Sequence, residues 1–244
     1  MQIKTNKIVS LLVSLFFIIS CGSSKKTGER TKSFKKYLET RNIDILKLDD
    51  SNYTDYYIDF LNDETKKLIM KNPYLKTNKV YVYQGRKQNI FCVFSDDGNE
   101  YLARIYKADS SVLTEPENSV VKLKQTVKLE FTGNFELTDT IIKIRRHVRE
   151  LSGKEWNGCD VGVFQKDTIR LIEVYDTKKY SYKKKWLTKR YKTNYKFVYN
   201  PNLKATRIEA TKDRNPSYLI EGSFNFERDL KEEAVLKLME KVRY

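Results

Sequence analysis

The sequence predicts an α+β fold that is rich in strands, with an antiparallel meander sheet that is curved or barrel-like. Hydrophobic residues recur at every second position across much of residues 78–226, which is typical of half-buried strands. Helical spacing occurs instead at 33–75 and at 228–243, so helices are expected on both sides of the strand region. Short turn sequences, such as DDG at 96–98 and NPN at 200–202, separate neighbouring runs. Sequential strands with short connections favour an antiparallel meander.

The chain begins with two lysines and an apolar run of 12 residues, Ile8 to Ile19, followed by Ser20 and Cys21. This layout is typical of a secretory signal peptide, and the run is too short to span a bilayer as a helix. The final residues, Ile-Ile-Ser-Cys, resemble the lipobox of bacterial lipoproteins. The resemblance implies that residues 1–20 are removed and that Cys21 then carries a thioether-linked diacylglycerol and an amide-linked third chain, palmitate being a typical acyl group. The alternatives are a simple cleaved signal or a short membrane anchor.

The resemblance implies a lipid-anchored protein of the bacterial cell envelope, on the periplasmic or surface side. Gly22, rather than an Asp, follows the cysteine, which slightly favours the outer membrane. Residues 21–32 are polar and basic and suit a flexible tether, and 33–244 is expected to form a single domain. Residues 1–20 carry two lysines and no acidic residue, so the remainder keeps a net charge of +13 out of +15.

The elements follow in order along the predicted domain. An amphipathic stripe predicts helices within 33–75, and another, preceded by a capping-box spacing, predicts a helix at 228–243. Strands are expected at residues 80–83, 90–94, 101–106, 120–131, 140–148, 168–175, 179–187, 190–199, 204–211 and 217–226.

Two segments are ambiguous. Residues 140–148 also fit a helix, but the segment 135–141 repeats the strand-and-turn pattern of 164–169, which favours a strand. Residues 152–160 are polar and rich in glycine, and a connecting loop is expected there.

The most unusual segment is a basic, aromatic hairpin predicted near residues 178–199, with no acidic residue between Thr177 and Ile208. In strand phase Tyr180, Tyr182 and Trp186 would share one face. The hypothesis is a cationic surface for an anionic lipid, lipopolysaccharide or an envelope protein, with nucleic acid the least favoured partner. Two alternatives are a solvated lysine face that discourages edge pairing and a face covered by the acidic segment 44–64. The candidate binding residues are Lys183, Lys184, Lys185, Trp186, Lys189, Arg190 and Lys192.

No catalytic constellation, metal site or cofactor site is recognisable. His147 is the only histidine and stands among arginines with no paired nucleophile, so a structural or surface position is expected. Cys92 lies in an apolar run, where a free thiol packs as a small hydrophobic group, yet an envelope location would also permit a disulfide with Cys159.

The sequence therefore predicts a membrane-tethered, non-enzymatic binding or scaffold module. The second hypothesis is a carrier or sensor of an apolar ligand, since lipocalins and half-barrel lipid-carrier lipoproteins have a similar general shape, although no motif of either family is present. The third is an enzyme of unrecognised type.

Overall fold

The computed structural model describes residues 30–149, 153–211 and 215–226. The predicted signal peptide, the lipidation of Cys21, almost all of the tether and the helix at 228–243 lie outside the described residues. The chain divides into two compact units, 1–64 and 65–244, which are described separately. Among the described helices, none has the length and apolar content that a membrane crossing requires.

The first unit is helical over the part that the structure describes. Residues 30–40 form a helix, η1 (Ile45–Lys47) is a single 3-10 turn capped by Asp44, and α2 (Asp50–Lys71) continues past the boundary between the units. Its small core is made largely of aromatic rings: the ring of Phe34 lies 5.4 Å from that of Phe60. The buried residues of this core recur at helical spacing along the chain, which is the pattern that predicted helices within 33–75.

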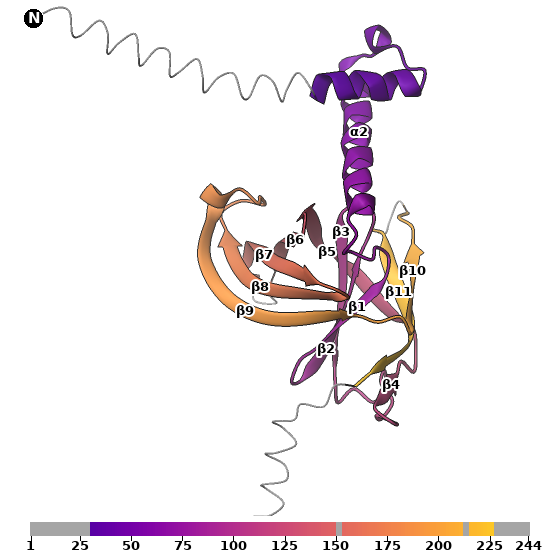
Figure 1. The fold of residues 1–244 in the computed structure, drawn as a ribbon, viewed down its shortest axis with the longest axis vertical. Helices are drawn as coiled ribbons and strands as arrows, with labels where there is room; N and C mark the ends of the chain where they lie inside the picture. The colour runs from indigo at the N-terminus through magenta and orange to yellow at the C-terminus, as the bar shows by residue number, and fades with distance from the viewer. Residues whose placement is uncertain (1–29, 150–152, 212–214, 227–244) are drawn as a thin grey trace, which may run out of the picture. The chain divides into compact units, whose positions relative to one another are not determined.

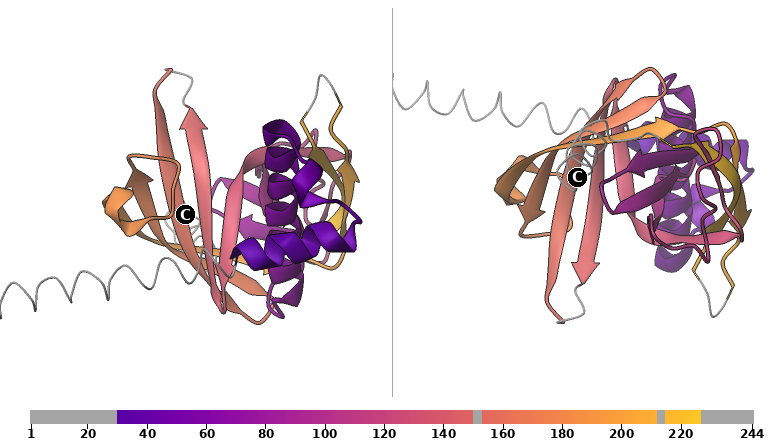
Figure 2. Two further views of the ribbon diagram at one scale, coloured as in Figure 1. Left: turned by 90° about the horizontal axis from the view of Figure 1, so that it is seen from above. Right: turned by 90° about the horizontal axis from the view of Figure 1, so that it is seen from below.

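The second unit contains an antiparallel β-barrel that is closed between β5 and β6 (Figures 1 and 2). Around the barrel the strand order is β5-β3-β2-β1-β9-β8-β7-β6. The strands are β1 (Val80–Gln84), β2 (Gln88–Phe94), β3 (Asn99–Tyr106), β5 (Val127–Thr138), β6 (Ile141–Arg149), β7 (Glu155–Gln165), β8 (Thr168–Thr177) and β9 (Leu187–Tyr199). The predicted strand-rich, barrel-like antiparallel sheet and the N-terminal helices are therefore confirmed.

Alternate side chains of these strands point into the barrel and form an apolar cluster. The cluster includes Cys92, Phe135 and Ile144 from three different strands, all of them fully buried or nearly so. Ile69 from the last turn of α2 and Leu75 from the segment after it join the same cluster, so these two residues cover one end of the apolar interior.

A second layer lies on the outer face of β1, β2 and β3. It consists of β4 (Val120–Lys122), β10 (Leu203–Ile208) and β11 (Ser217–Asn225). The sheet forks at β5, whose residues 127–129 pair with β11 and whose residues 133–138 pair with β6. A second apolar cluster fills the space between the layers. For this reason β2 is buried on both faces.

The hairpin β5–β6 depends on a glycine. β5 has an irregular register around Thr132, and the next residue, Gly133, lies against Arg146 of β6. A Cβ atom at Gly133 would collide with the carbonyl oxygen of Arg145. The backbones of β5 and β6 can therefore approach this closely only because residue 133 has no side chain.

Two strand predictions and one loop prediction need correction. Residues 120–131 form two strands, β4 and the start of β5, because the chain leaves β11 after Lys122 and returns to it at Val127. Residues 155–160, predicted as loop, belong to β7, whose polar Asp160 binds an interior arginine. Residues 179–187 form no strand, because Tyr180 and Tyr182 contact the outer wall of the barrel instead. The strand favoured at 140–148 is confirmed as β6.

Gly133→Ala tests the close approach of β5 and β6. We expect the free energy of unfolding to fall by about 2 kcal/mol or more, because backbone must move to admit the methyl group. Gly158→Ala is the matched control, since its nearest neighbour would be the Tyr175 carbonyl at 3.8 Å, an ordinary contact. Urea denaturation measures both, and equal stability of the two variants would contradict the proposed role of Gly133.

Candidate functional site

The connection between β8 and β9 carries most of the basic residues that the sequence singled out. We call residues 178–186 the strap; it ends in the 3-10 turn η2 (Lys184–Trp186). Figures 1 and 2 both place η2 on the opposite side of the second unit from β10 and β11. The strap and the start of β9 expose the following lysine side chains to solvent: Lys178, Lys179, Lys183, Lys184, Lys185, Lys189 and Lys192.

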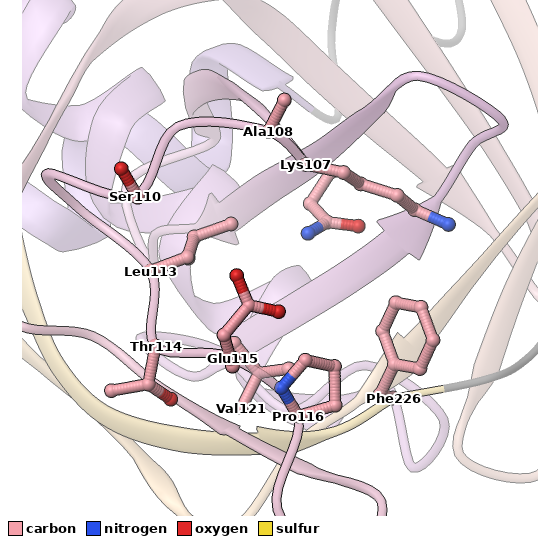
Figure 3. Close-up of a pocket in the computed structure, with 10 residues that line it drawn as sticks. Lys107, Ala108, Ser110, Leu113, Thr114, Glu115, Pro116, Val121 and Phe226 are labelled. Atoms are coloured by element: carbon pink, nitrogen blue, oxygen red, sulfur yellow. The ribbon is translucent and has the colours of Figure 1, made fainter.

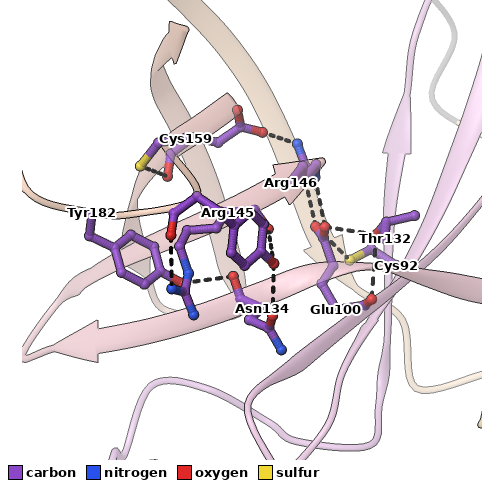
Figure 4. Close-up of polar contacts among 10 residues, drawn as sticks. Cys92, Glu100, Thr132, Asn134, Arg145, Arg146, Cys159 and Tyr182 are labelled. Atoms are coloured by element: carbon purple, nitrogen blue, oxygen red, sulfur yellow. Dashed lines mark hydrogen bonds and ion pairs between the residues drawn. The ribbon is translucent and has the colours of Figure 1, made fainter. Parts of the chain in front are cut away.

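Two tyrosines hold the strap against the outer face of β5 and β6 (Figure 4). The guanidinium of Arg145 lies over both rings, 4.6 Å from the centroid of Tyr180 and 4.5 Å from that of Tyr182. The Tyr180 hydroxyl donates to Oδ1 of Asn134 at 2.7 Å, and the Tyr182 hydroxyl donates to the Asn134 carbonyl at 2.7 Å. The tyrosines are thus occupied in attaching the strap.

Trp186 closes the strap at its other end. Its carbonyl accepts a hydrogen bond from the Lys178 amide at 2.9 Å, which joins the two ends of the segment. The ammonium groups of Lys179 and Lys185 lie 4.5 and 5.1 Å from the centroid of its ring. Cation–π contacts of this kind give two of the lysines a preferred position. The prediction that Tyr180, Tyr182 and Trp186 share a strand face is wrong, because no strand forms here.

The charges of this surface are mostly uncompensated. Arg190 forms an ion pair with Glu173, a carboxylate whose pKa is lowered by hydrogen bonds from Tyr175 and Arg190. Glu173 also lies across from Lys192 in the strand register, but within the described ranges no carboxylate lies at ion-pair distance from any of the seven exposed lysines. The predicted candidates Lys183, Lys184, Lys185, Lys189 and Lys192 are therefore together on one segment, whereas Arg190 is neutralised by its neighbour.

An ionic cluster inside the barrel was not predicted from the sequence. Arg146 binds Glu100 through two hydrogen bonds, from Nε at 2.7 Å and from Nη2 at 2.5 Å, and its Nη1 pairs with Asp160. Thr132 donates to the same Glu100 carboxylate at 2.9 Å (Figure 4). Glu100 lies 46 residues before Arg146, so only the closed barrel brings them together.

This interior cluster has the properties of a structural ion pair. Burial opposes the charge of Arg146, but the Glu100 carboxylate outweighs burial and raises the pKa of Arg146. Both carboxylates are almost completely buried, and the fork of the guanidinium meets both of them. Removing one partner from such a cluster typically costs about 3–5 kcal/mol, since it leaves a buried charge alone. The cluster therefore ties together side chains of β3, β6 and β7, although β3 pairs with neither of the other two strands.

The two cysteines are free thiols on opposite faces of the barrel wall. Cys92 belongs to the interior apolar cluster, as the sequence suggested. Cys159 is the register partner of Arg145, on the outer face next to the strap. The disulfide that the sequence left open is absent. Burial raises the pKa of the Cys159 thiol to about 11 and raises that of Cys92 well above its ordinary value.

His147 is half-exposed on β6, with Nδ1 3.1 Å from Oδ1 of Asn157 and Nε2 3.4 Å from a carboxylate oxygen of Glu155. Among the residues that the structure describes, no group of three His, Cys, Asp or Glu side chains could hold a metal ion. The contacts of His147 are those of a surface residue, in agreement with its expected position.

A small pocket lies beside the loop that follows β3 (Figure 3). Lys107, Glu115 and Phe226 line it together with Asn89, and its volume is about 60 Å³. Oδ1 of Asn89 is buried and has no protein partner in the described part of the chain. A pocket of this size holds a few water molecules, which would satisfy that oxygen. Solvation alone would therefore account for this pocket.

A larger pocket of about 220 Å³ lies where β1 and β9 separate. It is lined by Val82 and Gln84 of β1, by Lys196 and Val198 of β9, and by the 200–202 turn. Lys196 is the only lining residue with a formal charge in this set. The pocket is thus continuous with the basic strand β9.

Comparison with family models, with curated proteins and with solved structures finds no match for this chain.

Tyr182→Ala tests the attachment of the strap. At pH 9 a thiol with the ordinary pKa of 9.0 is half ionised, whereas a pKa of about 11 leaves about 1% of Cys159 as thiolate. The thiolate is the form that iodoacetamide alkylates. We therefore expect Cys159 to react about 50-fold more slowly in the native protein than in the protein unfolded by urea. Removing the Tyr182 ring should accelerate the alkylation of Cys159 and leave Cys92, inside the barrel, protected. Mass spectrometry of peptides resolves the two sites. A Cys159 that stays equally protected in the variant would contradict the covering role of the strap.

Proposed function

We propose that this protein is a membrane-tethered, non-enzymatic binding module of the bacterial envelope that holds an anionic partner on its exposed lysines. The observation that carries the proposal is the strap, in which the tyrosines face the barrel and the lysines are exposed to solvent, with no carboxylate of the described residues at ion-pair distance from them. Lys183, Lys184 and Lys185 are consecutive, and Lys189 follows within one short stretch of β9.

Electrostatics makes such a surface effective for a polyanion. Each lysine near an anionic surface contributes about 1 kcal/mol, and the contribution falls off within a Debye length of about 8–10 Å at physiological salt. Several lysines on a single short segment therefore act together on one partner, whereas the same number scattered over the molecule would not. Binding by this surface must weaken as the salt concentration rises.

The proposed location rests on Cys21. Acyl chains contribute about 0.8 kcal/mol per buried methylene, so two or three chains keep a protein on a membrane without further contacts. The short basic tether, residues 21–32, would keep the lysine surface near that membrane and near other envelope components. Anionic lipid, lipopolysaccharide and envelope proteins are all anionic partners that such a position offers.

A carrier function has weaker support. The apolar cluster around Phe135 and the ionic cluster around Arg146 occupy much of the barrel interior that the structure describes. A barrel of eight strands has an interior just wide enough to be filled by side chains or to hold one small ligand. The exposed lysines therefore remain the stronger basis for a function.

The test uses full-length protein in non-ionic detergent, retained on immobilised polyglutamate and eluted by salt. Replacing Lys183, Lys184, Lys185 and Lys189 by Gln should lower the salt concentration needed for elution. The matched control replaces four exposed lysines elsewhere, Lys35, Lys36, Lys87 and Lys122, and removes the same charge. It should elute close to the wild type. Equal shifts of the two variants, or no shift of either, would falsify the proposal.

A further inference from the structure

The strand that follows the strap has an open edge. β9 pairs with β8 from Leu187 to Val198, but it pairs with β1 only through Val198 and Tyr199. One further backbone hydrogen bond, from the Asn200 amide to the Val80 carbonyl, extends this short paired region, which we call the β1–β9 seam. Over residues 187–197, the side of β9 that faces away from β8 has no backbone partner within 30–149, 153–211 and 215–226.

The hydrogen bonds at the β1–β9 seam show which way the N–H and C=O groups of β9 point. The Asn200 amide points toward β1, and the Tyr199 amide points the other way, to the carbonyl of Asp167 in the turn before β8. Amides alternate in direction along a strand, so the N–H and C=O groups of Val198 also face β1 and those of Lys196 face the open edge. An edge of this kind is a template for another extended segment.

The side chains along β9 specify which segment would fit. Tyr195 and Phe197 pair across from inward residues of β8, and the Tyr195 ring lies 5.1 Å from that of Tyr83. Tyr191 and Tyr195 are nevertheless 48% and 44% exposed, and no strand of the described residues pairs with β9 at these two positions on the open edge. The opposite face of β9 carries the cations Lys192 and Lys196, together with Arg190, which is already paired with Glu173.

An added strand would place its alternate side chains beside these two rows. Cross-strand neighbours stabilise a sheet when opposite charges or aromatic and β-branched residues face each other. Acidic residues would therefore suit the row of cations, and apolar residues would suit the tyrosines. The pocket of about 220 Å³ between β1 and β9 lies at the end of the open edge and offers room for the last side chain of such a segment.

We propose that the open edge of β9 binds an extended peptide segment of a partner protein, in which acidic and apolar residues alternate, by strand addition. This inference rests on the proposed function and names the partner class of the same basic surface. A second copy of this chain is a poorer occupant, because pairing β9 with itself would bring rows of like charge together. Lipid headgroups do not present the regularly spaced N–H and C=O groups of an extended peptide, which pairing with the edge requires.

The first experiment leaves the protein unchanged. Full-length protein in detergent is titrated with two labelled peptides of the same composition, one with alternating glutamate and valine and one with all glutamates before all valines. Fluorescence polarisation should show at least about tenfold tighter binding of the alternating peptide, from several cross-strand pairs. Hydrogen exchange should show new protection of the Lys196 amide and its neighbours in β9.

The second experiment changes one backbone donor. Lys196→Pro removes an amide that faces the open edge, where proline is tolerated in a strand, and Lys196→Gln removes the same charge only. The proline variant should bind the alternating peptide about tenfold more weakly than the glutamine variant, while both keep the same retention on polyglutamate.

The outcomes separate the two proposals. Equal binding of the two peptides, with retention on polyglutamate still dependent on the strap lysines, would overturn strand addition and leave the proposed function standing. Loss of that lysine dependence would overturn the proposed function itself. Slow exchange of the Lys196 amide in the free protein would show that the edge is already occupied, by residues 227–244 or by a second copy, and would also overturn strand addition.

Discussion

The guanidinium of Arg145 lies between the strap and the barrel wall, within 4.6 Å of the Tyr180 and Tyr182 ring centroids. This contact determines which side chains of the strap face the barrel and which remain exposed for binding. Consecutive lysines repel one another, so they do not stabilise any single conformation of the segment. The tyrosines stabilise one conformation, because their rings pack on the guanidinium of Arg145 and their hydroxyls bind Asn134. The lysines before and after the two tyrosines remain exposed to solvent.

The barrel itself explains why β9 has an open edge. Three strands meet at the ionic cluster of Glu100, Arg146 and Asp160, and Gly133 lets β5 and β6 approach closely. This side of the barrel is strongly fixed. The opposite seam, between β1 and β9, has few pairs because β1 is short and β9 is long. The length difference leaves most of β9 without a neighbour on one side.

The spacing of hydrophobic and turn residues along the sequence predicted much of this fold but little of the structure of the strap. Alternating apolar residues marked β1 and β2 correctly, and the repeated turn pattern decided β6 over a helix. β7 was missed because Asp160 is buried against Arg146, and a polar residue in a strand interior resembles a loop when its partner is unknown. The aromatic spacing of the strap imitated a strand, although its tyrosines bind residues more than 30 positions away.

The candidate lysines, by contrast, needed no long-range information. Lysine side chains are almost never buried unless paired, so a dense run without acidic neighbours was expected at the surface. What the sequence could not supply was the absence of a covering carboxylate among the described residues and the position of the run beside an open edge. Both depend on which strands meet across the barrel.

Lysine footprinting tests the central claim most directly. Full-length protein is acetylated briefly, with and without bound polyglutamate, and each lysine is quantified by mass spectrometry. The account predicts protection of Lys183, Lys184, Lys185 and Lys189 by the bound polyanion, with Lys35, Lys36 and Lys122 modified at the same rate in both samples. Uniform protection of all lysines, or protection confined to lysines outside the strap and β9, would contradict it.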